Sequence, residues 1–184
     1  QRMGFVVRDG VTAETRAHVE GSYKNALAAM TAMLKSRPYL LGETPSIADF
    51  GLMGPMLRHF GQDPTPVEIM RNTAPAVYEW VARVWNAHAT AGKPAFVNDV
   101  PAEATPMLKE IAETHLVQLS ANAEAHGRNA SHFDMTVQGT RYKRLPVSRY
   151  RVWCLEKLRE SFAALSPAEQ QRVRALLPYP PADI

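Results

Sequence analysis

The chain has 184 residues, of which 46% are apolar and 21% are charged, and its formal net charge is +3. These values exclude a disordered chain and allow one sizeable hydrophobic core. No apolar run reaches the roughly 18–20 residues of a membrane-spanning helix, so we expect no membrane partner. Cys154 is the only cysteine, which excludes an internal disulfide and favours a reducing, cytoplasmic setting.

The first long helix is predicted from residue 12 to residue 36. Residues 1–11 have no clear period and are expected to form an incomplete lead-in. After them, Val19, Tyr23, Leu27, Met30 and Leu34 recur at the spacing of one helix face. The helix is expected to end before Pro38, because a proline disfavours helical geometry at the preceding residue.

The next helix has the clearest start signal in the sequence. Ser46 is a suitable N-cap, and Asp49, three residues later, can accept a hydrogen bond from the Ser46 backbone N–H. The segment 50–57 is apolar nearly all round, which predicts a buried central helix, kinked at Pro55.

A third strong helical pattern follows the break at Asp63-Pro64. Its apolar stripe consists of Val77, Trp80, Val81, Val84 and Trp85. A loop containing Gly92, Pro94 and Pro101 then separates this helical body from a C-terminal extension.

The extension is predicted to begin with a long helix over 103–125 and to continue with a small β-hairpin near 132–147. Alternating apolar residues and a Gln138-Gly139-Thr140 turn indicate the hairpin. Two closing helices follow. The fold is therefore expected to be all-α, with a lead-in at 1–11, a helical bundle at 12–100 and a helical extension at 101–184.

The segment Pro38-Tyr39-Leu40-Leu41-Gly42-Glu43-Thr44-Pro45-Ser46-Ile47-Ala48-Asp49-Phe50 resembles one carried by glutathione S-transferases in their C-terminal helical domain. In that family, a helix ends at a Leu-Gly turn and the next opens with a Ser/Thr-x-x-Asp capping box. The resemblance extends from about Tyr23 to Trp85, and beyond Pro101 the chain looks like the long extension that some members add.

The resemblance implies a two-domain subunit that forms a homodimer. A thioredoxin-like N-terminal domain would bind glutathione and activate its thiol, and the helical domain would supply the pocket for a hydrophobic electrophile and much of the dimer interface. No β-α-β pattern precedes Thr12, so the glutathione-binding domain is expected to be missing from this chain. We accordingly assign no catalytic residue and no cofactor to the chain itself, and glutathione only to the full-length parent.

Three sets of side chains invite a catalytic or metal-binding interpretation. Ser46 and Asp49 form a tempting pair, but helix capping accounts for both, so we interpret them as structural. The six histidines are scattered without ligand spacing, and we expect no metal site. Cys154 follows two arginines, which favours a reactive thiol, whereas its apolar neighbours favour burial.

A basic run at 141–151 is the most unusual local feature, since it holds five positive charges and no negative one. Arg144 and Tyr150 within it, and Trp153 just after it, are candidate residues for ligand binding or for a domain interface. Such a run can bind nucleic acid, but a solvated hairpin edge or pairing with acidic residues of another domain also explains it. We favour the structural explanations and do not expect nucleic acid as a partner.

Two functional hypotheses follow. The first is the electrophile-pocket and dimerisation half of a glutathione S-transferase-like protein, inactive by itself. The alternative is a stand-alone protein-interaction module without catalytic activity.

Overall fold

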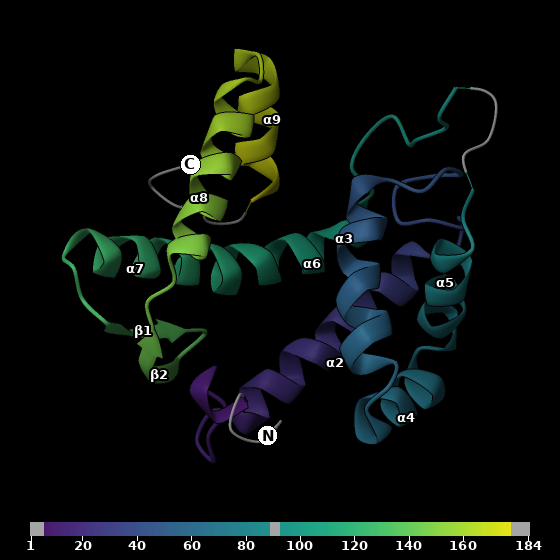
Figure 1. Cartoon of the computed structure of the whole chain (residues 1–184). Coiled ribbons are helices and arrows are strands. Elements are labelled where there is room, and N and C mark those ends of the chain that lie inside the picture. The colour runs from purple at the N-terminus through teal and green to yellow at the C-terminus, as the bar shows by residue number, and fades with distance from the viewer. Residues whose placement is uncertain (1–5, 89–92, 178–184) are drawn as a thin grey trace. The chain divides into compact units, whose positions relative to one another are not determined.

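The computed structural model describes residues 6–88 and 93–177, and within them helices dominate (Figure 1). This confirms the predicted all-α class with one small hairpin. The α-helices are α2 (Arg16–Met33), α3 (Ile47–Pro55), α4 (Pro64–Thr73), α5 (Pro75–Trp85), α6 (Thr105–Glu110), α7 (Leu116–Gly127), α8 (Arg149–Ala163) and α9 (Pro167–Leu176). Shorter turns are η1 (Met56–Phe60), η2 (Ala102–Ala104) and η3 (Ile111–His115), and the strands are β1 (His132–Val137) and β2 (Thr140–Pro146).

Packing divides the chain into two compact units. One consists of Tyr23–Met107, and the other combines Gln1–Ser22 with Leu108–Ile184. We call them the central unit and the terminal unit. The division by packing differs from the predicted ranges 1–11, 12–100 and 101–184, because the start of α2 packs with the C-terminal segment. Residues 1–5 of the predicted lead-in lie outside the described residues.

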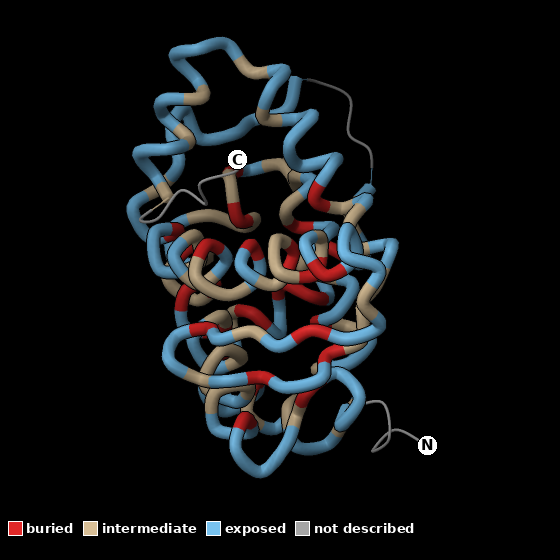
Figure 2. Tube along the Cα trace, turned by 90° about the vertical axis from the view of Figure 1, so that its left-hand side faces the viewer, coloured by how far each residue is buried: buried red, intermediate tan, exposed pale blue. Residues whose placement is uncertain are grey.

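The core of the central unit is built from α2, α4 and α5. Its fully buried side chains include Met30, Met70 and Trp80. Figure 2 shows that buried residues are interspersed along the trace, as expected for helices that each bury one face. Gly42, in the turn before α3, has φ +148°, and an added Cβ would lie 2.4 Å from the Ala95 carbonyl oxygen, so only glycine fits there.

The prediction that α3 is a buried central helix was wrong. Within the predicted segment 50–57, Met56 is buried but Phe50 is 50% exposed, and the only buried residue of α3 itself is Asp49. Helix α3 packs against α5 and against η1, which follows it. Its apolar composition permits burial all round, but most of its residues stay partly or fully exposed. Near Pro55 the helix passes into the π-turn η1, as expected where a proline removes an N–H donor.

The terminal unit contains the predicted hairpin, which is confirmed. Strands β1 and β2 pair in antiparallel fashion through a turn at Gln138 and Gly139, both of which have positive φ. One face of the hairpin supplies Phe133, Tyr142 and Leu145 to a small core, against which Val19 of α2 packs.

The predicted helix over 103–125 is also confirmed, although it is not uniform. The chain is helical from Ala102 to Gly127, with the π-turn η3 between α6 and α7. Buried Asn122 of α7 then holds the β2–α8 connection: its Oδ1 accepts from the Ser148 N–H at 2.8 Å, and its Nδ2 donates to the Ser148 carbonyl at 2.9 Å. Helices α8 and α9 follow, with Arg174 of α9 stacked over the Phe162 ring of α8.

Candidate functional site

Asp49 is fully buried at the N-terminus of α3, and both of its carboxylate oxygens are occupied. Oδ2 accepts from the Ser46 backbone N–H at 2.8 Å and from the Ser46 hydroxyl at 2.7 Å. Oδ1 accepts from the Leu40 N–H at 2.9 Å and from Trp80 Nε1 at 2.9 Å. The carboxylate therefore joins three segments: the start of α3, the chain before it and the middle of α5.

This arrangement leaves Asp49 little capacity for chemistry. A general base must reach a substrate proton within hydrogen-bonding distance. The Asp49 carboxylate instead accepts four hydrogen bonds from neighbouring protein groups, and the residue has no exposed surface. These donors satisfy its buried carboxylate, and its role here is to fix the geometry of the central unit.

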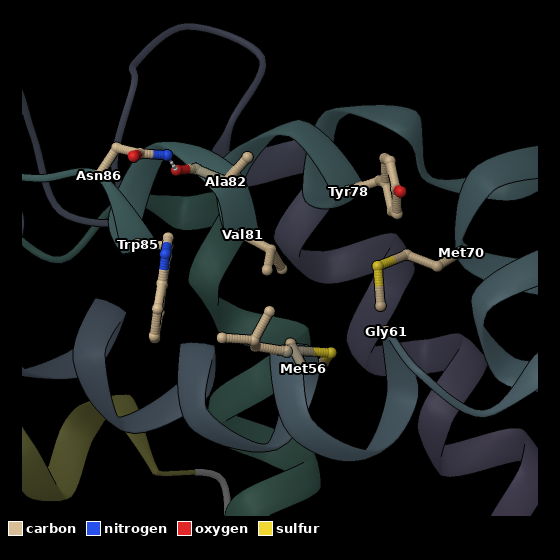
Figure 3. Close-up of a pocket in the computed structure, with 9 residues that line it drawn as sticks. Met56, Gly61, Met70, Tyr78, Val81, Ala82, Trp85 and Asn86 are labelled. Carbon is tan, nitrogen blue, oxygen red and sulfur yellow. Dashed lines mark hydrogen bonds between the residues drawn. The ribbon is translucent and has the colours of Figure 1, made fainter.

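A small apolar pocket lies between η1, α4 and α5 of the central unit (Figure 3). Its volume is about 250 Å³. Met56, Met70 and Val81 converge at its centre, while Trp85 extends along one side of it. The two methionines are unbranched and polarisable, so they adapt to ligands of different shape.

Polar groups lie at the rim of this pocket, which we call the methionine pocket. The Tyr78 hydroxyl accepts a hydrogen bond from Arg71 Nη2 at 2.9 Å, and the same guanidinium lies 4.9 Å from the Tyr78 ring centroid. At the other end, Asn86 Nδ2 donates to the Ala82 carbonyl at 2.8 Å. A mostly apolar cavity with a few polar groups at its edge is typical of small-molecule sites.

The three candidates from the basic run lie in the terminal unit, outside the methionine pocket. Tyr150 and Trp153 stack on α8 with ring centroids 5.7 Å apart, and both are exposed, at 69% and 49%. Arg144 lies instead at a bulge in β2, where its φ is +53° and its N–H donates to Asp134 Oδ1 at 2.9 Å. Tyr150 also lines a second cavity, next to Cys154 and His115.

The residues of the methionine pocket were not among the site candidates predicted from the sequence. The stripe at 77–85 was predicted to be apolar, and Val77, Trp80, Val81 and Val84 are indeed buried. Trp85 differs, since it is 67% exposed and lines the pocket. The exposure of Trp85 could have been expected from its position, because it is the last residue of α5 and the helix does not continue beyond it.

Within residues 6–88 and 93–177, no group of three or more His, Cys, Asp or Glu side chains is placed to hold a metal ion. Among the helices of this part of the chain, none is long and apolar enough to cross a bilayer.

The class of this helical domain follows from a comparison with protein families. Residues 13–83 match the family model described as "Glutathione S-transferase, C-terminal domain". This segment is therefore a glutathione S-transferase C-terminal-like domain, which confirms the resemblance stated above. No significant match was found among curated proteins or among solved structures.

Proposed function

We propose that this chain supplies the hydrophobic co-substrate site of a glutathione S-transferase-like protein, and that the methionine pocket takes part in binding the electrophile. The single observation that carries this proposal is an apolar cavity of about 250 Å³ formed largely within the segment that matches the family. Electrophiles conjugated to glutathione are apolar, so burial against methionine and tryptophan side chains favours them.

The remaining parts of the proposal follow from the family. A thioredoxin-like domain binds glutathione and activates its thiol, the assembled protein is a cytoplasmic homodimer, and the present 184 residues alone do not conjugate glutathione. In support, both described strands belong to the antiparallel β1–β2 hairpin, which is not a glutathione-binding β-α-β unit.

Binding and catalysis are tested separately. We expect 1-chloro-2,4-dinitrobenzene to quench the fluorescence of Trp85, because a nitroaromatic ring in the pocket lies against the indole. Ala82→Phe should abolish this quenching by filling the pocket from its exposed rim. Glu79→Phe, an equally exposed position on α5 outside the lining, is the matched control. Equal quenching in both variants contradicts the proposed pocket.

The catalytic part is tested with glutathione and the same electrophile. The chain alone should give no rate above the spontaneous reaction, and the chain joined to a glutathione-binding domain should give one. Conjugation by the isolated 184 residues would overturn the proposal that they are inactive. Analytical ultracentrifugation of the joined protein tests the homodimer.

A second candidate function, a protein-interaction module, is favoured by the exposed apolar surface of α3. Ile47 and Phe50 present large apolar side chains to solvent, and such surfaces mark interaction sites when they are contiguous. If this function holds, Ile47→Ser abolishes association with a partner while leaving quenching by 1-chloro-2,4-dinitrobenzene unchanged. Quenching that Ala82→Phe abolishes, without any partner association that Ile47→Ser abolishes, supports the transferase-like function.

A further inference from the structure

The terminal unit contains a second and larger cavity at the N-terminus of α8. Its volume is about 580 Å³, which lies within the range of small-molecule sites. Apolar side chains such as Leu119 and Val147 form part of its wall. Arg8, His115, Tyr150 and Arg151 add polar groups from the chain before α2, from η3 and from α8.

The electrostatics of α8 are unusual at this end. The first turn of the helix, after the N-cap Ser148, carries Arg149 and Arg151 and no acidic residue. A helix N-terminus already has a partial positive charge, so two cations there are unfavourable and an anion is stabilising. Among the described residues, no ion pair involves Arg8, Arg149 or Arg151. Two of these arginines, Arg8 and Arg151, line the cavity.

The uncharged polar groups of the cavity suit the same kind of ligand. The Tyr150 hydroxyl is protonated at neutral pH, and its hydrogen bond with Cys154 raises its pKa further. Burial, together with the charge of Arg151, lowers the pKa of His115, which leaves its imidazole neutral. Asp9 is the only acidic residue among the described lining residues, so the two arginines leave the wall with a net positive charge.

We propose that this cavity binds a small organic carboxylate with an aromatic or branched aliphatic body. Arg8, Arg151 and the N-terminal end of α8 hold the carboxylate group, and Leu119 and Val147 contact the apolar body. The site is independent of the methionine pocket, since all of its residues belong to the terminal unit. It also gives a role to Arg151, at the end of the basic run that the family resemblance leaves unexplained.

The experiment compares 2-naphthoate with neutral 2-naphthamide, which has the same ring system and no charge. Binding to the full chain is measured by isothermal titration calorimetry at constant ionic strength. We expect 2-naphthoate to bind at least about tenfold more tightly than the amide, the size of one charge-assisted hydrogen bond. Arg151→Gln and Arg8→Gln should each remove this preference. Arg149→Gln, next to Arg151 but outside the lining, is the matched control and should retain it.

Cys154 provides an independent readout, because it lines the cavity and is the only cysteine of the chain. Bound 2-naphthoate should slow its reaction with N-ethylmaleimide, and 2-naphthamide at the same concentration should not. Circular dichroism verifies that each variant is folded, and either arginine variant suffices if the other is not. Equal binding of naphthoate and amide, or a preference that survives both arginine variants, overturns the proposal.

Discussion

Removing the Asp49 carboxylate should strongly destabilise the central unit. Asp49→Ala deletes the acceptor of four hydrogen bonds. Two of the donors, the Leu40 N–H and Trp80 Nε1, belong to residues that are almost completely buried, so water cannot replace the lost acceptor.

The magnitude follows from these partners. Each buried donor without an acceptor costs about 1–3 kcal/mol, and the lost interaction at the helix N-terminus adds about 0.5–2 kcal/mol. Part of this sum is offset because a buried charge is also removed. We therefore expect Asp49→Ala to lower the free energy of unfolding by about 3–5 kcal/mol. Ser46→Ala, which removes one hydroxyl at the rim of the same network, should cost about 0.5–2 kcal/mol.

The assay is urea unfolding followed by tryptophan fluorescence in a Trp153→Phe background. The remaining tryptophans, Trp80 and Trp85, both lie in the central unit, so their signal reports that unit alone. Glu68→Ala, at an exposed position of α4, is the control and should change the free energy by less than about 0.5 kcal/mol. An Asp49→Ala transition that coincides with that of the control would refute the proposed role of the buried carboxylate.

Three further predictions concern the terminal unit. Arg144→Gly should raise its stability by about 1 kcal/mol, measured by thermal denaturation, because φ is +53° at this position and glycine adopts such a conformation without strain. Asn122→Ala should cost about 1–3 kcal/mol and speed hydrogen exchange of the Ser148 amide, since two part-buried hydrogen bonds of the buried Asn122 side chain are lost. The Arg144 N–H and the Arg141 guanidinium lower the pKa of Asp134. These interactions stabilise the fold at pH values above the pKa that Asp134 has in the unfolded chain. The stabilisation is lost as pH falls through the lower pKa that Asp134 has in the folded protein, and an NMR titration of the Asp134 carboxyl group can follow this pKa.

The part of this structure that was predictable from sequence is local. Ser46 and Asp49 are three residues apart, and the chemistry of a helix start is sufficient to relate them. The donors that complete the network are Leu40 and Trp80, and Trp80 lies 31 residues away from Asp49. No periodicity specifies that separation, since it depends on how α5 packs against α3.

Helix α3 shows a prediction from composition that was wrong. Its apolar composition led to the prediction of a buried central helix, and the structure exposes Ile47 and Phe50. Composition shows which surface can be buried, but burial also requires a neighbouring surface, and that information is not present in the segment itself. The same limit applies to both cavities, because their linings combine side chains from segments that are distant in sequence.

The start of α2 shows why the family segment and the packing unit do not coincide. The match begins at residue 13, yet His18 contacts the C-terminal hairpin: its Nδ1 pairs with the Tyr142 hydroxyl at 2.7 Å, and its Nε2 pairs with Gln138 Oε1 at 2.9 Å. Gln138 in turn donates to Glu113 Oε2 at 2.9 Å. These contacts, together with Val19 against the hairpin core, tie the first turns of α2 to residues more than 90 positions later. The first turns of α2, which the family model includes, therefore pack with the extension in the terminal unit.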